Sequence, residues 1–191
     1  SMNDTIGKLH NVDFDKVNLA DYGKHENYMD RQIHRWTKQY KDSETQMIPE
    51  INELIEWLPK NIPSDQETTI VHGDFRLDNM IFDPITHEVK AILDWELSTL
   101  GNPIADFTYH MMSWRLPAGA KGLGMMGSDL KSLNIPSESE YAELYYKKTG
   151  REKIDNWDFY MAYNIFRLAG IAQGIVGRVR DGTASSSEAK N

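Results

Sequence analysis

The chain has 191 residues, of which 40% are hydrophobic and 26% are charged, and its formal net charge at pH 7 is −8. This size and composition fit one globular domain or two small ones with a real core, and the acidic balance argues against nucleic-acid or anionic-membrane surfaces, which need clustered Lys and Arg. The sequence contains no Cys, which excludes disulfides, thiolate zinc sites and a cysteine nucleophile. No stretch resembles a spanning helix or a secretion signal, so we expect no membrane partner and a cytoplasmic or other reducing location.

The first part of the chain favours helices and loops. Ser1-Met2 resembles an expression scar, and residues 3–25 predict a short helix followed by a loop that ends near Gly23. Over residues 26–40, apolar side chains recur at spacings of four, three and four, which is typical of an amphipathic helix. A second helix before Pro59 has an apolar face made of Met47, Ile48, Ile51, Leu54, Ile55 and Leu58.

The stretch TIVHGDFRLDNMIFDPITHEVKAILDWELSTL, residues 69–100, carries three polar residues on short apolar strands. Residues 70–71 lead into a polar loop, and residues 80–82 and 91–93 predict two further strands. Asp83-Pro84 between these strands is a turn opener. The pattern is therefore strand, polar loop, strand, turn, strand and acidic residue.

Two helices with clear start signals follow. Asn102-Pro103 is a good N-cap and first helical residue, which predicts a helix over residues 104–114. Ser137 with Glu140 makes a capping box for a helix over residues 138–148, which Gly150 ends. Between them, residues 116–136 are rich in Gly, Ser and Pro and predict a long mobile loop.

The last predicted helix covers residues 155–180. An apolar stripe runs along it and consists of Met161, Ile165, Leu168, Ala169, Ala172, Ile175, Val176 and Val179. Gly170, Gly174 and Gly177 each cost roughly 1 kcal/mol of helix propensity relative to Ala, which close packing against another helix would offset. We expect residues 3–180 to form one helical lobe, and the polar residues 181–191 to be a disordered tail.

Asp74, Asn79 and Asp94 form the chemical core of the sequence. Gly73 gives the backbone freedom just before Asp74, and Asp94 ends an apolar strand. An amide oxygen and a carboxylate at neighbouring strand ends are hard ligands of the kind that Mg²⁺ takes together with substrate phosphates and water. A second carboxylate nearby can accept a proton from an attacking hydroxyl. The pattern therefore indicates metal-assisted phosphoryl transfer.

These residues also carry a resemblance to a known family. HGDxxxxN followed by LDW resembles the catalytic and metal-binding motifs of the aminoglycoside phosphotransferase and choline kinase-like family, whose fold is related to protein kinases. The segment LSTLGNPIADF resembles the family's G-x-P-x-x-D segment. The segments LHNVDF and GIAQGIVGR resemble the subgroup that occurs alone in bacteria or fused to acyl-CoA dehydrogenases. The implied fold class is α+β and mainly helical, with a β-hairpin carrying the catalytic and metal-binding loops.

The resemblance implies a role for each matching residue. Asp74 is similar to the catalytic aspartate that orients the acceptor hydroxyl and takes its proton, and Asn79 and Asp94 are similar to the Mg²⁺ ligands. His72 and Asp106 match residues that support the site, and a buried structural role suits His72 better than proton transfer.

Other candidate residues are less defined. Arg76 is either a surface charge or a phosphate contact, and its sequence context does not separate the two. Two interpretations fit a further set of residues: they line the acceptor pocket, or they are ordinary core or surface residues. The set consists of Trp114, Arg115, Tyr160, Tyr163 and Asn164. The glycines of AKGLGMMGSD spell G-x-G-x-x-G, but no strand precedes them, so a phosphate-binding loop is not expected there. The remaining histidines show no i, i+4 pair, which argues against a zinc site.

A kinase also needs a β-rich N-terminal lobe that covers the nucleotide phosphates, and nothing before Asp74 has that pattern. The chain therefore resembles the C-terminal lobe alone, whose partner is the missing N-terminal lobe of its own protein. The resemblance implies an ATP- and Mg²⁺-dependent kinase acting on a small-molecule hydroxyl, inactive as this fragment. A non-catalytic scaffold domain that keeps the fold, and a metal-dependent hydrolase, remain alternatives.

Overall fold

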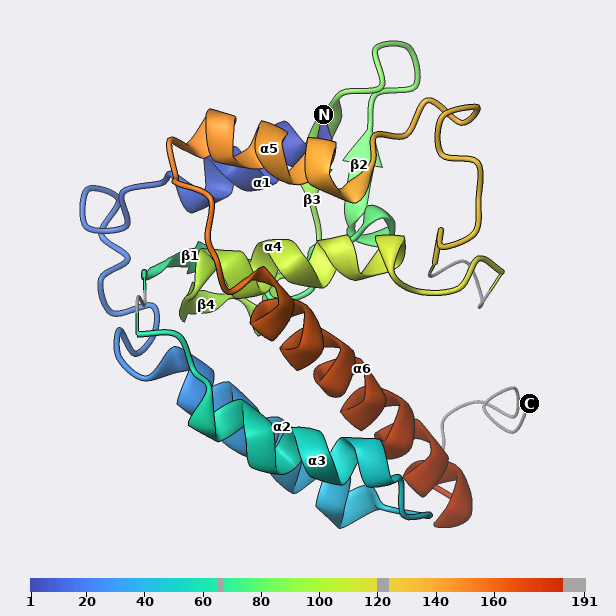
Figure 1. Ribbon diagram of the computed structural model, residues 1–191. Coiled ribbons are helices and arrows are strands. Elements are labelled where there is room, and N and C mark those ends of the chain that lie inside the picture. The colour runs from blue at the N-terminus through green and yellow to red at the C-terminus, as the bar shows by residue number, and fades with distance from the viewer. Residues whose placement is uncertain (65–66, 120–123, 184–191) are drawn as a thin grey trace. The chain divides into compact units, whose positions relative to one another are not determined.

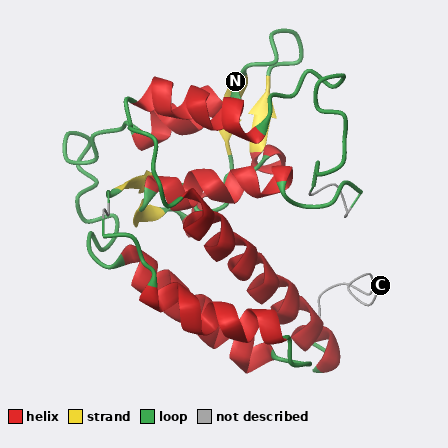
Figure 2. Ribbon diagram, in the orientation of Figure 1, coloured by secondary structure: helices red, strands yellow, loops and turns green. Residues whose placement is uncertain are grey.

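The computed structural model describes residues 1–64, 67–119 and 124–183. The described chain is mainly helical with four short strands (Figure 1, Figure 2). It divides into two compact units, one formed by residues 1–26 and 65–157 and the other by residues 27–64 and 158–191. Each unit is considered by itself. Within the described residues, no helix combines the length and the apolar character needed to cross a bilayer.

The first unit contains the central stretch. Its helices and strands are α1 (Met2–His10), β1 (Thr69–Val71), β2 (Met80–Phe82), β3 (Val89–Ile92), β4 (Thr99–Gly101), α4 (Pro103–Met111) and α5 (Glu138–Thr149). Short 3-10 turns at Leu77–Asn79, Trp95–Leu97 and Met112–Trp114 connect several of them. Helix α1 packs against α5 and β1, so the N-terminal helix contacts the strand that leads into the polar loop.

The strands form two small antiparallel sheets. Strands β2 and β3 pair as a hairpin with Ile81 opposite Ala91, which confirms the two predicted strands and the turn between them. Strand β1 pairs with β4, with Ile70 opposite Leu100. No strand was predicted at β4, because three residues are too few for a periodic signal and only the pairing with β1 defines it.

The predicted caps of α4 and α5 are confirmed. The Asn102 side chain accepts hydrogen bonds from the amides of Ile104 and Ala105, at 2.9 and 3.0 Å. At α5, Ser137 and Glu140 form a reciprocal capping box, and Gly150 ends the helix in the left-handed conformation with φ of 73°. These caps fix where α4 begins, and α4 carries Asp106 in its first turn.

The second unit is built from α2 (Tyr28–Ser43), α3 (Pro49–Trp57) and α6 (Trp157–Arg180), although Trp157 itself belongs to the first unit. The α6 glycines face α2: a Cβ on Gly177 would lie 3.0 Å from the Cβ of Ser43, and a Cβ on Gly170 would lie 3.6 Å from the Trp36 ring. This close approach of α6 to α2 is the helix packing that was expected to offset the low helix propensity of the glycines.

The apolar stripe read from the sequence is not the buried face of α6. Ile165, Ile175 and Val176 are 36%, 39% and 48% exposed, and of the stripe only Met161 is buried. The buried face instead consists of Phe159, Tyr160, Met161, Tyr163, Asn164, Phe166, Arg167, Gly170, Gln173, Gly174 and Gly177. Aromatic and glycine residues share this face, and a pattern based on aliphatic side chains alone misplaced it.

Candidate functional site

The loop between β1 and β2 holds Asp74. Strand β1 is fully buried, and Phe75 immediately after Asp74 is also buried, with 0% exposure. The Asp74 side chain is half-buried between these anchored neighbours. Gly73 has φ of +84°, and a Cβ there would lie 2.6 Å from the Leu97 carbonyl oxygen. The loop therefore depends on glycine both for its backbone angle and for its close approach to the turn after β3.

Asp74 and Asn79 are in direct contact. The Asn79 Nδ2 group donates to Asp74 Oδ2 at 3.0 Å and to the Asp74 carbonyl oxygen at 2.9 Å. One carboxylate oxygen of Asp74 is thereby held in place. The amide nitrogen of Asn79 is used by these bonds, which leaves its Oδ1 atom as the acceptor available for another ligand.

Asp94 follows the end of β3, beside the start of β2. Met80 pairs with Ile92 in the hairpin, and the Leu93 amide donates to the Asn79 carbonyl oxygen at 2.8 Å. Asp94 itself is exposed and has a left-handed backbone, with φ of 64°. Asp and Asn tolerate this conformation better than most residues. The pairing therefore delivers Asn79 and Asp94 from adjacent strand ends, as the sequence pattern indicated.

The donor set at this point fits Mg²⁺ better than a transition metal. The described part of the chain contains no group of three or more His, Cys, Asp or Glu residues that could hold a metal ion. What Asn79 and Asp94 offer is one amide oxygen and one carboxylate, both hard oxygen ligands. Mg²⁺ commonly binds to one or two such protein ligands and completes its shell with water and substrate phosphates.

His72 joins the Asp74 loop to the Asp94 loop. Its Nδ1 atom accepts the Asp74 amide hydrogen at 3.2 Å, and its Nε2 atom donates to the Leu93 carbonyl oxygen at 2.9 Å. These two bonds assign the proton to Nε2, because Nδ1 must keep a lone pair. The ring also lies against Trp95, with the ring centroids 4.8 Å apart. His72 is completely buried and both its nitrogen atoms are occupied, and its supporting role stays a prediction.

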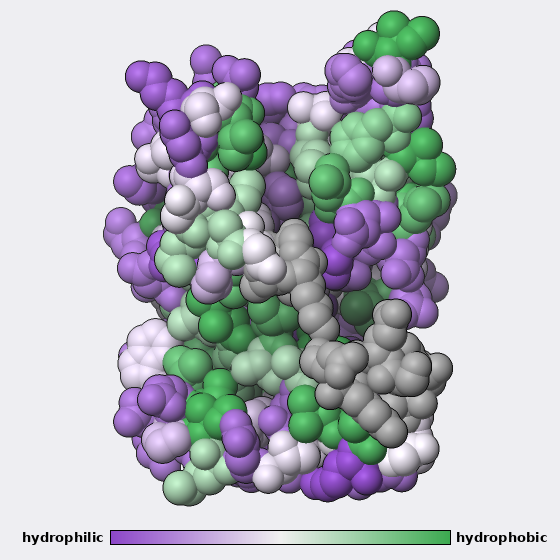
Figure 3. Space-filling model, turned by 90° about the vertical axis from the view of Figure 1, so that its right-hand side faces the viewer, coloured by the Kyte–Doolittle hydropathy of each residue, from purple (hydrophilic) through white to green (hydrophobic). Residues whose placement is uncertain are grey.

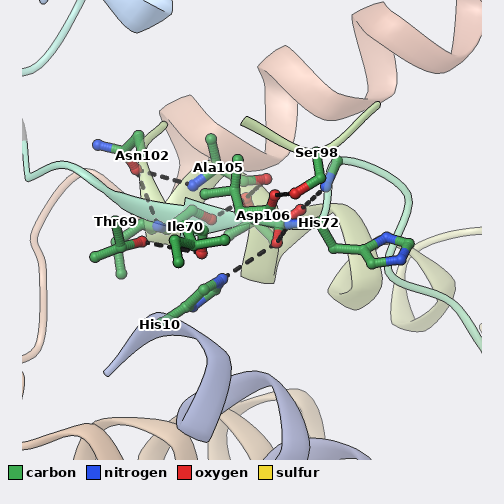
Figure 4. A network of polar contacts seen from close by, with 12 residues as sticks. His10, Thr69, Ile70, His72, Ser98, Asn102, Ala105 and Asp106 are labelled. Carbon is green, nitrogen blue, oxygen red and sulfur yellow. Dashed lines mark hydrogen bonds and ion pairs between the residues drawn. The ribbon is translucent and has the colours of Figure 1, made fainter. Parts of the chain in front are cut away.

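Asp106 holds the backbone on the other side of the loop (Figure 4). Its Oδ2 and Oδ1 atoms accept the amide hydrogens of His72 and Gly73, both at 2.8 Å. Burial of this carboxylate favours the neutral form, but hydrogen bonds from His10 and from the two amides outweigh that effect and lower the pKa of Asp106. The carboxylate is therefore ionised at neutral pH and binds two consecutive amides just before Asp74.

Arg76 forms an ion pair with Asp78 on the exposed side of the same loop. Burial acts to lower its pKa, but the charges of Asp78 and Asp74 raise it overall. The guanidinium therefore stays charged near Asp74. A phosphate contact by Arg76 stays a prediction, and it would require the Asp78 pair to open or to be shared.

The predicted pocket residues lie in both units. In the first unit, the Trp114 indole donates to the Pro136 carbonyl oxygen at 2.9 Å, and Arg115 binds Glu138 through two nitrogen atoms. In the second unit the other three are buried in α6, and they are Tyr160, Tyr163 and Asn164. A shared pocket stays a prediction for this set.

The glycine pattern falls partly outside the described residues, since Gly122 is not among them. Gly124 takes part in an isolated bridge with Ala118, and a Cβ on Gly124 would lie 2.1 Å from the Leu116 carbonyl oxygen. Gly127 has φ of +90° with open space around it. Steric contact within this loop is sufficient to account for Gly124.

Sequence reasoning missed two buried residues that contact Asp106 directly or through one neighbour. His10 at the end of α1 binds Asp106, and Tyr145 of α5 binds His10. Neither contact has a local signature, because 96 and 135 residues separate the partners. The Trp95 ring against His72 was missed as well.

Comparison with known proteins agrees with this geometry. Residues 1–144 match the model of the phosphotransferase enzyme family. The chain is 47% identical to mouse acyl-CoA dehydrogenase family member 10 over 191 residues, which is 100% of this chain but 18% of the mouse protein. The chain therefore spans less than a fifth of that relative.

Two solved structures share the fold. A Ralstonia eutropha protein provisionally named an aminoglycoside phosphotransferase is 52% identical with a TM-score of 0.95, over 99% of this chain and 58% of that one. A type VIII aminoglycoside-3'-phosphotransferase is 15% identical with a TM-score of 0.61, over 86% of this chain and 58% of that one, and supports the kinase-like fold alone. The fold is α+β, as the C-terminal lobe of such a protein. By its family model and its geometry together, the chain belongs to the phosphotransferase enzyme family.

Proposed function

We propose that the chain is the C-terminal lobe of an ATP- and Mg²⁺-dependent kinase that transfers the γ-phosphoryl group to a hydroxyl of a small molecule. The observation that carries this proposal is the contact between Asp74 and Asn79, next to the strand end that delivers Asp94. Family membership supports small-molecule phosphotransfer in general. ATP, the metal and the hydroxyl acceptor are the parts that we add.

In the proposed reaction, the acceptor oxygen attacks the γ-phosphorus, the bond to the bridging oxygen of ADP breaks, and the acceptor proton passes to Asp74. Asn79 fixes Oδ2 of Asp74, which leaves the other carboxylate oxygen as the one that would take the acceptor proton. Asn79 Oδ1 and the Asp94 carboxylate would hold Mg²⁺. When bound, the ion neutralises charge on the phosphate oxygens.

A second lobe is part of the proposal. Several apolar side chains on the hairpin and its flanking loops are exposed, and they are Leu77, Ile81, Leu93, Trp95 and Leu97, with exposures of 61%, 49%, 44%, 38% and 36%. Hydrophobic residues are also visible among the polar ones on the face drawn in Figure 3. The Ralstonia relative extends beyond the matched part, which supports a nucleotide-binding lobe that covers these residues.

The acceptor class is open to direct test. The names of the relatives point to two candidates, aminoglycosides and hydroxylated acyl compounds. A screen of both classes against the longer protein, with ATP and Mg²⁺ and with ADP release as the signal, would identify the acceptor. The 191-residue chain alone is expected to show no turnover in the ordinary kinase range of ~1 to 100 s⁻¹. Turnover in that range by the chain alone would contradict the need for a second lobe.

Asp74→Asn in the longer protein separates the kinase from a scaffold. We expect kcat to fall by roughly 10²- to 10⁴-fold while nucleotide binding is kept, because the proton acceptor is lost and the side chain keeps its size. Asp42→Asn is the control, since Asp42 is an exposed carboxylate on α2 paired with Lys38. Unchanged activity in Asp74→Asn would rule out the proposed mechanism, and detection of phosphate release without an acceptor would favour a hydrolase.

A further inference from the structure

His10 is a buried histidine that the proposed reaction does not use. It is the last residue of α1, is 1% exposed, and reaches Asp106 with Nε2 at 3.1 Å (Figure 4). On its other side, Nδ1 lies 2.7 Å from the hydroxyl of Tyr145. Buried polar groups of this kind are costly unless every atom has a partner, and here both ring nitrogens have one.

The direction of the hydrogen bond between His10 and Asp106 can be assigned. Asp106 is ionised and accepts only, so His10 Nε2 donates to it. Nδ1 lies within hydrogen-bond distance of the Tyr145 hydroxyl, which keeps its proton because burial raises the pKa of Tyr145. Tyr145 is itself fixed by stacking on Phe107, with ring centroids 3.9 Å apart. A chain of hydrogen bonds therefore links Tyr145, His10 and Asp106.

The chain of hydrogen bonds from Tyr145 and His10 reaches the loop that bears Asp74 at Asp106. The same Oδ2 atom that accepts from His10 also accepts from the His72 amide, while Oδ1 accepts from the Gly73 amide. The Asp106 carboxylate can rotate about its Cβ–Cγ bond. The amides of His72 and Gly73 are adjacent in the chain, so they limit this rotation from one side only. The Nε2 donor of His10 reaches it from a separate element, α1, and limits the rotation from another direction.

We propose that His10, held by Tyr145, is a positioning residue that fixes the Asp106 carboxylate and thereby the backbone conformation of the loop that bears Asp74. The N-terminal helix α1 thus takes part in shaping the site, although it contains none of the three residues assigned to chemistry. The positioning role of His10 rests on the proposed kinase function only in that the loop is called catalytic. Its test measures the loop backbone directly. A negative result for His10 therefore leaves the kinase proposal standing, and a failure of the kinase proposal leaves the His10 result standing.

The test is amide hydrogen exchange and amide chemical shifts, measured by NMR on the ¹⁵N-labelled 191-residue chain. In His10→Ala we expect the His72 and Gly73 amides to exchange at least tenfold faster than in the unchanged chain, with their proton shifts moved upfield. Two conservative variants sharpen the result. The Gln amide of His10→Gln reaches the position of Nε2 and should restore slow exchange, whereas the shorter Asn of His10→Asn reaches only the position of Nδ1 and should not.

Ile6→Val is the matched control, because Ile6 is a fully buried residue of the same helix α1 that has no polar contact with Asp106. It should lower stability without a selective change at His72 and Gly73. Should His10→Ala not fold, the comparison of the Asn and Gln variants decides, together with Tyr145→Phe, which removes only the hydroxyl. Loop exchange in His10→Asn and Tyr145→Phe equal to that in Ile6→Val would overturn the proposal, as would a uniform loss of protection throughout the first unit.

Discussion

The amide of Asp74 donates a hydrogen bond to Nδ1 of His72, two residues earlier in the chain, at 3.2 Å. The same ring donates through Nε2 to the carbonyl oxygen of Leu93, the residue before Asp94. One imidazole therefore fixes the backbone next to two of the three residues assigned to chemistry. Both ring nitrogens are thereby engaged with the backbone, and a supporting role for His72 without proton transfer stays a prediction.

Replacing His72 with Ala should destabilise the protein by about 2–4 kcal/mol, because it removes a fully buried ring, opens a cavity and leaves two part-buried backbone groups without their partner. Urea denaturation of the 191-residue chain measures this loss. His34→Ala is the matched control, since His34 is exposed on α2 and its replacement should change the free energy of unfolding by less than about 0.5 kcal/mol. Equal effects of the two substitutions would contradict the bridging role of His72.

Gly73 combines a backbone requirement with a spatial one, and Gly119 allows the two to be separated. Both have φ of +84°, but a Cβ on Gly73 would meet the Leu97 carbonyl oxygen at 2.6 Å whereas one on Gly119 would meet nothing within 4 Å. Gly119→Ala should therefore cost only the backbone strain of about 1 kcal/mol. Gly73→Ala should lower the free energy of unfolding by at least about 1 kcal/mol more than Gly119→Ala does. Denaturation of both variants in parallel measures this difference. A similar cost at both positions would show that the contact with Leu97 is relieved easily.

Sequence alone predicted the parts of the fold that depend on local chemistry. Asn102 and the Ser137–Glu140 box give strong capping signals because a side chain bonds to the backbone only two or three residues away. The β2–β3 hairpin was predicted for the same reason, since its turn and strands are adjacent in the chain. The contact of Asp74 with Asn79 spans five residues and agrees with the motif spacing.

The remaining parts depend on contacts between distant segments. Strand β4 exists because Leu100 pairs with Ile70, and nothing in its three residues requires a strand. His10 reaches Asp106 across 96 residues, and a single buried histidine has no sequence signature. The buried face of α6 was misjudged because Gly170 and Gly177 pack there by virtue of being small, which a hydrophobic pattern does not register.

His110 predicts a specific pH dependence of stability. Rings of Phe75, Trp114 and Tyr141 enclose it, and its burial lowers its pKa from 6.5 to about 4, although the charge of Asp106 acts in the opposite direction. Between these two pH values the unfolded chain binds a proton at His110 and the folded chain does not. Stability should therefore fall as the pH is lowered through this window, by up to about 3 kcal/mol from this residue.

The measurement is the free energy of unfolding of the unchanged chain and of His110→Gln at several pH values from 7 to 4. Gln does not titrate, so the variant should lose less stability than the unchanged chain across the window, even if it is less stable at pH 7. His34→Gln provides the comparison at an exposed position, where the pH dependence should stay as in the unchanged chain. Parallel curves for all three proteins would show that His110 is not held neutral by its surroundings.

Asp94 allows the metal assignment to be tested without disturbing the fold. Its backbone is left-handed, with φ of 64°, and Asn accepts that conformation as readily as Asp, so Asp94→Asn changes the charge but not the strain. In the longer protein we expect the Mg²⁺ concentration for half-maximal activity to rise by at least about tenfold, because an anionic oxygen ligand becomes neutral. Glu88→Gln removes another exposed carboxylate, from the hairpin turn, and should leave the Mg²⁺ requirement unchanged. If saturating Mg²⁺ restores activity to Asp94→Asn, the residue acts through metal affinity; an unaltered Mg²⁺ requirement would instead remove Asp94 from the metal site and leave Asn79 without its partner ligand.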